Sequence, residues 1–507
     1  MSALSVGSSL SVATHAEPPR HKRSCCGIAG RIGLNAVKAP FRAVGYLGGR
    51  LLRVPAVIQR GVGAAYARCA RTKHLEVVTD EMLASCQGKS KTEKRLIVQK
   101  FVADHASRLV PSSCCDNPGN RKILSDRIAQ ILLTHADQPE ALRAQIVKNA
   151  IRNFKDHLTS SVARIKEDIK NDADFQSAFG IRPTDTIIRI QVLGCETHNK
   201  GKNPLFIELS SGKKNIYKPR SLISEKLLCG GRGSAFALVG IRGVYPVCDR
   251  GGYGYAEWLE NRKEENTFAS REELEEYFSQ FALIEGVASF FGVSDLHQDN
   301  VITRRKCPCL IDTEVIAPVD CEAYSTNLLG DGVSGYCPAS DSKNRFWMTR
   351  GISAVHEKNL KIADDPLDAF YVSREMGIHH VLFDPTAKKR TAEYLETFAG
   401  ELTSLREELS RHTHRIVLIK TCQLDYLIRS NPDESFDEFY TSLVKGLNSY
   451  AFTQTVDRDT LKRQFIEDVM NNDVPVFYYC PNTGEVMYGR HVVGRKVKTE
   501  HLTTAVG

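Results

Sequence analysis

Three short polar motifs contain the residue types that phosphoryl transfer requires. Residues Asp295–Asn300 read Asp-Leu-His-Gln-Asp-Asn, Asp312 follows twelve residues after this motif, and Lys218 lies upstream at the end of a strand-like run. Phosphoryl transfer needs a cation on the nucleotide phosphates, carboxylate and amide oxygens on Mg²⁺, and a carboxylate that orients the attacking hydroxyl. The sequence therefore predicts a site that uses ATP and Mg²⁺, with Lys218, Asp295, Asn300 and Asp312 at its centre.

The order of these motifs is that of a protein kinase, but several kinase signatures are missing. Kinases place a strand lysine first, then an Asp-Leu-x-x-x-Asn loop, then a metal-binding Asp. No Gly-x-Gly-x-x-Gly loop precedes Lys218, Val293–Asp295 stands in place of His-Arg-Asp, and Asp312–Glu314 stands in place of Asp-Phe-Gly. We therefore expect a divergent kinase-like fold, or one adapted to a second reaction.

Hydrophobic periodicity predicts the elements that position these residues. Helical spacing extends over residues 78–176, and a strong amphipathic helix is expected over Arg271–Phe291, ending at Gly292. Residues 186–193 and 242–247 indicate strands, and residues 205–209 and 215–218 indicate a β-hairpin. A second, short hairpin is expected over 301–303 and 310–312, and helical patterns return after residue 390.

These elements predict an α+β, divergent two-lobed protein-kinase-like fold, with a small antiparallel sheet lobe and a larger helical lobe. The expected division has three parts: a basic leader over 1–75, a helical region over 76–180, and a catalytic domain over 181–490. Within the catalytic domain, the sheet lobe spans about 181–250 and the helical lobe about 265–490.

Several motifs together resemble the dehydratase domain of class II (LanM-type) lanthipeptide synthetases. An Asp-x-His motif of that family is matched by Glu196–His198, and a strand motif by Tyr217–Arg220. The remaining matches, in chain order, are the aromatic segment Tyr253–Trp258, the Asp-x-His-x-x-Asn loop Asp295–Asn300, the Asp-x-Glu strand Ile311–Glu314, the Arg415…Thr421 element and the segment Asp473–Phe477.

The resemblance implies two reactions in one site. ATP first phosphorylates a Ser or Thr hydroxyl of a peptide or protein, and the site then expels the phosphate, which leaves dehydroalanine or dehydrobutyrine. It implies that Lys218 pairs the nucleotide phosphates, that Asp295 and His297 act around the hydroxyl, and that Asn300 and Asp312 hold Mg²⁺. It implies that Glu314 supports the site and that Arg220 and Glu314 lie at the cofactor with Lys218. Arg415 and Thr421 are implied to bind the phosphate being eliminated, with His198 and Arg220 as further candidates. Because the family's cyclase domain is not expected in this chain, ring formation would need a separate cyclase.

The positive charge of the chain is concentrated in its leader. Twelve Lys/Arg and no Asp/Glu lie between Pro18 and His74, so the chain after residue 75 carries a net charge of −3 although the total is +8. This distribution argues against a nucleic-acid-binding body. Residues 27–72 alternate short apolar groups with arginines, which is compatible with contact to an anionic membrane or with a flexible tail. No export signal or membrane-spanning segment is recognised, and the cysteines lack zinc-finger spacing.

Four interpretations of function remain open from sequence. The first is a stand-alone dehydratase in the bacterial cytoplasm that modifies a ribosomal peptide. The second is a translocated bacterial effector that applies the same chemistry to a host protein, with a peripheral membrane location as one option. The third is a kinase that has lost elimination, and the fourth is a nucleotide-binding pseudoenzyme. Intact Lys218, Asp295, Asn300 and Asp312 argue against the pseudoenzyme.

Overall fold

The computed structural model describes residues 75–194, 196–260, 265, 271–296, 300–319, 321, 324, 326 and 385–496. All of them lie within the unit Lys73–Gly507. The predicted leader, with its membrane-contact segment 27–72, and the candidate His297 lie outside the described residues. None of the helices in the described ranges has the length and apolar character needed to cross a bilayer.

The predicted helical region over 78–176 is confirmed. A helical stretch over 75–85 is followed by α3 (Lys91–Asp104), α4 (Ala106–Leu109), α5 (Pro118–Thr134), α6 (Glu140–Asn171) and α7 (Ala173–Phe179). Local sequence fixes the starts of these helices. Ser90 and Glu93 form a capping box before α3, and Pro118 occupies the first turn of α5, where its missing N–H has no cost.

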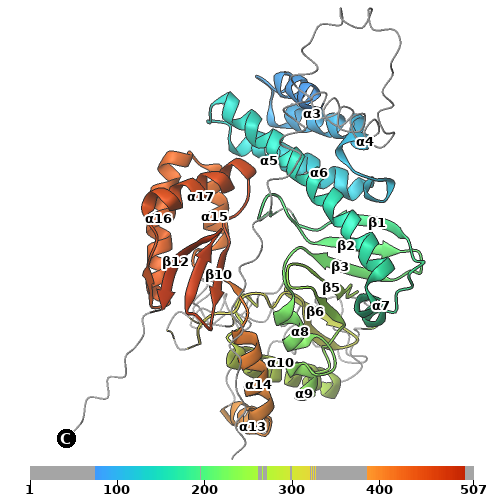
Figure 1. Ribbon diagram of the computed structural model, residues 1–507, viewed down its shortest axis with the longest axis vertical. Helices are drawn as coiled ribbons and strands as arrows, with labels where there is room; N and C mark the ends of the chain where they lie inside the picture. Colours follow the sequence, from blue (N-terminus) through green and yellow to red (C-terminus); the bar gives the residue numbers. More distant parts are fainter. Residues whose placement is uncertain are drawn as a thin grey trace, which may run out of the picture. The chain divides into compact units, whose positions relative to one another are not determined.

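The predicted sheet is a five-stranded antiparallel sheet with the strand order β1-β2-β3-β5-β4 (Figure 1). Its strands are β1 (Ile187–Val192), β2 (Leu205–Leu209), β3 (Lys214–Lys218), β4 (Val247–Asp249) and β5 (Gly254–Glu257). The strand expected over 242–247 is wrong, because pairing begins only at Val247. Pro246 has no N–H to donate, and the N–H of Tyr245 bonds the carbonyl of Cys229 instead of a strand.

The two faces of this sheet pack against different helices. On one face, Arg164 of α6 donates to the Tyr217 hydroxyl at 2.9 Å, and the Tyr255 hydroxyl donates to Asp168, also of α6. Because neighbouring side chains of a strand point to opposite faces, Lys218 points away from α6. The second face belongs to a core that also contains residues of α8 (Ile223–Cys229), α9 (Ala235–Leu238) and α10 (Arg271–Phe291).

The predicted helix over 271–291 is confirmed. A short hairpin follows it, but its second strand lies earlier than the predicted 310–312, because the chain already turns at Arg305 and Lys306. Gly292 ends α10 with a backbone φ of +76°, a conformation that favours glycine. The hairpin consists of β6 (Val301–Arg304) and β7 (Cys307–Leu310), and Asp312 follows the end of β7. Asn300, which precedes Val301, and Asp312 are therefore held at the same end of one hairpin.

The region expected to be only a helical lobe contains a second five-stranded antiparallel sheet. Its strand order is β8-β10-β11-β12-β9. The strands are β8 (His414–Ile416), β9 (Phe452–Gln454), β10 (Phe477–Cys480), β11 (Glu485–Tyr488) and β12 (His491–Lys496). The core of this sheet also contains residues of α15 (Thr421–Arg429), α16 (Pro432–Ser449) and α17 (Arg458–Asn471). The helices α13 (Pro385–Glu396) and α14 (Ala399–Ser410) pack instead with α10 and α8. Strands of three to six residues are too short for alternation to reveal them in sequence.

A candidate phosphoryl-transfer site

Lys218 occupies the last position of β3 and is almost entirely buried, with 6% of its surface exposed. Its ammonium group donates to the Ile311 carbonyl at 2.7 Å, to Asp312 Oδ1 at 3.0 Å and to Glu225 Oε1 at 3.2 Å. These three contacts use all three donors of the ammonium group. The predicted strand lysine and the predicted metal-binding Asp therefore meet directly, although 94 residues separate them.

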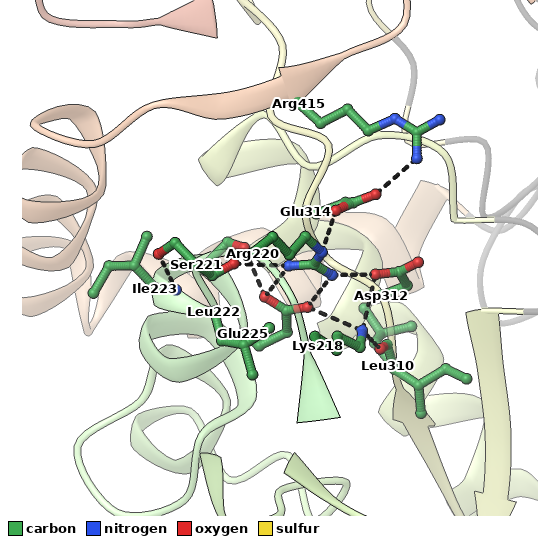
Figure 2. A network of polar contacts seen from close by, with 12 residues as sticks. Lys218, Arg220, Ser221, Leu222, Ile223, Glu225, Leu310, Asp312, Glu314 and Arg415 are labelled. Atoms are coloured by element: carbon green, nitrogen blue, oxygen red, sulfur yellow. Dashed lines mark hydrogen bonds and ion pairs between the residues drawn. The ribbon is translucent and has the colours of Figure 1, made fainter. Parts of the chain in front are cut away.

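Arg220 joins the same cluster from two residues further along (Figure 2). Its guanidinium contacts both oxygens of Glu225, and it also forms ion pairs with Asp312 and Glu314. Glu314 in turn accepts from Arg415 NH1 at 2.8 Å. One chain of charged contacts thus runs from Lys218 to Arg415 and brings together five of the predicted site residues.

The opposite charges in this cluster offset the unfavourable effect of burial on one another's charged forms. Burial alone would raise the pKa of Asp312, but Lys218 and Arg220 outweigh it and hold that pKa below its ordinary value. Burial alone would lower the pKa of Lys218, but Asp312 and Glu225 raise it above its ordinary value. The lysine is therefore a cation and the aspartate an anion at neutral pH, as contact with phosphate and a divalent cation requires.

The loop that carries Asp295 is tied to the start of the hairpin. Asn300 donates from its side chain to the Asp295 carbonyl at 2.9 Å, and its own carbonyl accepts from the N–H of Ile311 at 3.0 Å. Asp295 has a positive φ of 63°, which is strained for a residue with a side chain. Such strain persists only where surrounding structure supports it, and it is common at functional sites.

Mg²⁺ suits the chemistry of the predicted donor pair. The described residues contain no group of three or more His, Cys, Asp or Glu arranged to hold a metal. Mg²⁺ commonly takes only one or two protein oxygens and completes its shell with phosphates and water. Asp312 and Asn300 supply one carboxylate and one amide oxygen of this kind.

His198 and Glu196 extend the charged cluster on the side of Arg415. His198 Nε2 lies 2.9 Å from Glu196 Oε1, and Glu196 lies 3.7 Å from Arg415 NH2. The other ring nitrogen of His198, Nδ1, lies 2.8 Å from the Val474 carbonyl. Both ring nitrogens of His198 therefore face an oxygen that can accept a hydrogen bond.

Arg415 and Thr421 lie at the two ends of one short connection. Arg415 is the middle residue of β8, and its backbone also pairs with the segment that follows Glu314. Thr421 is the first residue of α15 and is half-buried. Backbone N–H groups at a helix start attract anions, so this end of α15 is compatible with the phosphate contact predicted for Thr421.

Glu225 is a site residue that the sequence interpretation missed. It lies on α8, 1% of its surface is exposed, and it contacts both Lys218 and Arg220. Burial alone would raise its pKa, but Arg220 and Lys218 hold it below the ordinary value. A signal was present, because an acid within a short amphipathic helix directly after a Lys-Pro-Arg motif is a natural partner for those two cations.

A cavity of about 540 Å³ lies at the opposite end of β3 from Lys218. Its lining includes Lys213–Asn215, Glu257, Trp258 and Arg304, and it contains none of the predicted site residues. Its cations are largely paired: Lys214 contacts Glu260 and Arg304 contacts Glu257. The predicted site residues therefore gather in the charged cluster around Lys218 and not in this cavity.

Comparison with known proteins agrees with the family predicted from the motifs. Residues 142–335 match a family described as a domain of unknown function, DUF4135. The lacticin 481/lactococcin biosynthesis protein LcnDR2 of Lactococcus lactis subsp. lactis is 28% identical over 181 residues. That alignment covers 34% of this chain and 18% of the relative, so the chain spans less than a fifth of the relative's length.

The matched range 142–335 contains α6, the first sheet, α8, the loop at Asp295 and the hairpin that precedes Asp312. Fold and charged cluster define a protein with a mixed helix-and-sheet body and a buried Lys–Glu–Asp site. Taken with the two matches, they support the resemblance to a LanM-like dehydratase domain that the motifs predicted.

Proposed function

We propose that this chain uses ATP and Mg²⁺ to phosphorylate Ser or Thr residues of a peptide and then eliminates the phosphate to leave dehydroamino acids. The observation that carries the proposal is the contact of Lys218, on the third strand of the sheet, with both Glu225 and Asp312. Protein kinases need a β3 lysine paired with a glutamate of the following helix, together with a metal-binding aspartate. In this chain Lys218 lies on the third strand, Glu225 lies on the helix that follows that strand, and Asp312 takes the place of the metal-binding aspartate.

In this proposal the residues of the cluster have separate tasks. Lys218 binds the nucleotide phosphates, Asp312 and Asn300 hold Mg²⁺, and Asp295 orients the hydroxyl that attacks. Mg²⁺, when bound, offsets negative charge on the transferred phosphoryl group. Glu225 keeps the two buried cations in place.

The second reaction removes the α-proton of the phosphorylated residue and breaks its Cβ–O bond, so that a Cα=Cβ double bond forms and phosphate leaves. It uses the part of the cluster around Arg415. Phosphate leaves far more easily than hydroxide, especially where fixed cations meet its developing charge. Arg415 is such a cation, His198 lies beside its partner Glu196, and Thr421 follows β8 at the start of α15. The peptide substrate is proposed from the relative, which is a lacticin 481/lactococcin biosynthesis protein.

The test is mass spectrometry of a pool of synthetic Ser/Thr-containing peptides incubated with the chain, ATP and Mg²⁺. Phosphorylation adds about 80 Da to a peptide, and completed dehydration removes about 18 Da. We expect the loss with the wild-type chain and no change with Lys218→Met. A wild-type chain that accumulates only the heavier product would restrict the function to a kinase, and one that changes no peptide would contradict the proposal.

A further inference from the structure

The segment that follows α17 holds the loop that carries His198. Val474 N–H donates to the Thr197 carbonyl at 2.8 Å, and the Thr197 hydroxyl donates to the Asn472 carbonyl at 3.0 Å. The Val474 carbonyl also accepts from His198 Nδ1. Residues 472–474 thus contact the His198 loop through both backbone and side chain, although the two are more than 270 residues apart in the chain.

Between these contacts, the carboxylate of Asp473 fills a concave turn of backbone N–H groups. Asn199, Lys200 and Gly201 have consecutive positive φ angles of 49°, 69° and 74°. The N–H groups of Lys200 and Gly201 both donate to Asp473, one to each carboxylate oxygen, and the Gly201 contact measures 2.9 Å. Successive N–H groups in a left-handed turn form a nest that binds an anion, and here the anion belongs to the protein itself.

This turn depends on Asp473 for its shape. Two adjacent residues with side chains in the left-handed region are strained, and strain of this kind persists only with external support. Position 201 has no room for a side chain, since a Cβ there would lie 2.7 Å from the Cβ of Asn153. Asp473 is itself only 1% exposed, so it supports the loop from inside and does not meet a substrate.

The turn begins immediately after His198, so its shape sets the direction of the imidazole. That ring reaches Glu196, and Glu196 reaches Arg415. We propose that Asp473 is a positioning residue for the elimination reaction, which it serves by fixing His198 and Glu196 beside Arg415. This inference rests on the proposed two-step function. Among the described residues, the side-chain hydrogen bonds and ion pairs of Lys218, Glu225 and Asp312 go to one another and to Arg220, Ser224 and Ile311, and none reaches the 472–474 segment. Phosphorylation should therefore not depend on Asp473.

The direct test is Asp473→Asn in the full chain. Asparagine keeps one acceptor but turns the other oxygen into a donor, so one of the two nest N–H groups would face a donor. Asp468→Asn is the matched control. Asp468 is also a carboxylate of the α17 region, but it accepts from the Tyr488 hydroxyl and does not touch the His198 loop.

Two measurements decide the outcome. Hydrogen–deuterium exchange at Lys200 and Gly201 should become about tenfold faster or more in Asp473→Asn and stay unchanged in Asp468→Asn, as expected for loss of a buried hydrogen bond. With the peptide pool, Asp473→Asn should phosphorylate at a rate near wild type and accumulate the phosphorylated product, with dehydration slowed about tenfold or more.

Three results would overturn the inference: unchanged exchange in Asp473→Asn, equal acceleration in Asp468→Asn, or an equal fall of both reaction steps. A general loss of folding would slow phosphorylation and dehydration equally. A positioning role would slow dehydration and leave phosphorylation near the wild-type rate. A wild-type chain that modifies no peptide would contradict the proposed function. In that case the elimination role is lost, and the exchange data alone decide whether Asp473 shapes the loop.

Discussion

At the scale of single residues, Glu225 has the largest effect on the charge balance of the site. It is buried with two cations, and each of its oxygens is contacted by Arg220, while Lys218 shares one of them. Removing one member of a buried ionic group leaves the others without compensation, which is strongly unfavourable. The position of Lys218 therefore depends on a residue that itself does not need to touch the nucleotide.

We predict that Glu225→Gln lowers kcat/KM for peptide phosphorylation by about 10²-fold, because a misplaced Lys218 would bind phosphate in the wrong geometry. The measurement is the initial rate of phosphopeptide formation. Glu260→Gln is the control, since Glu260 pairs with Lys214 at the other end of the same strand at 2.6 Å. A similar loss of kcat/KM in both variants would contradict a specific effect of Glu225 on the position of Lys218.

At the scale of elements, α16 packs closely on the segment that leads to Thr421. A Cβ added at Gly446 of α16 would lie 2.1 Å from the Leu418 carbonyl, whose backbone cannot easily move away. We expect Gly446→Ala to lower the free energy of unfolding by about 1–3 kcal/mol, the range typical of overpacking. Urea denaturation monitored by circular dichroism measures this change.

Gly400→Ala provides the comparison, because a Cβ at Gly400 of α14 would meet nothing within 4 Å. Alanine is the better helix former, so this variant should be as stable as wild type or more stable by up to about 1 kcal/mol. Equal destabilisation by the two substitutions would contradict the close packing of α16 on Leu418.

The second sheet and α17 share a buried acid that makes stability depend on pH. Asp468 is partly exposed as a residue, but its carboxyl group is enclosed, and burial raises its pKa to about 7. An acid with a raised folded pKa keeps a proton in the native state that the unfolded chain releases above about pH 4. Its contribution to stability is therefore complete at low pH and is lost as the pH rises from about 4 to about 7.

Asp468→Asn should remove this contribution. We predict that the free energy of unfolding of the variant falls less steeply between pH 4.5 and 7 than that of wild type, by at most about 1.4 kcal/mol per pH unit. Chemical denaturation at several pH values gives both slopes. Identical slopes would show that Asp468 does not hold its proton in the native state.

At the scale of the whole molecule, the basic leader is separable from the site. The unit Lys73–Gly507 includes every described site residue, and residues 142–335 alone carry the family match. We predict that a chain beginning at Lys73 unfolds at the same temperature as the full chain and phosphorylates peptides at the same rate. Thermal denaturation and the peptide assay test this, and a loss of either would assign residues 1–72 a part in folding or catalysis.

The same truncation tests the predicted membrane contact. Cosedimentation with vesicles that contain anionic lipid should capture the full chain, and the chain beginning at Lys73 should stay in the supernatant. High salt should weaken the binding of the full chain, because attraction between arginines and lipid headgroups is screened. Equal binding by both chains would place the contact in the slightly acidic remainder of the protein.

Local sequence was sufficient for the elements and for the positions of the main motifs. The helices before residue 180, the hairpin that ends at Lys218, the helix Arg271–Phe291 and the hairpin before Asp312 were all predicted. Each depends on side-chain periodicity, caps or turns, and these signals involve residues only a few positions apart in the sequence. The second sheet was missed because its strands are short and their pairing partners lie far along the chain.

Only the tertiary structure decided which charges share the site. Asp312 lies 94 residues from Lys218, and Glu314 lies 101 residues from Arg415, so no spacing rule connects them. The same holds for Asp473 and the loop after His198. Once burial removes water from a cation, it must be paired with whatever acid the fold brings within reach, and that choice depends on the path of the whole chain.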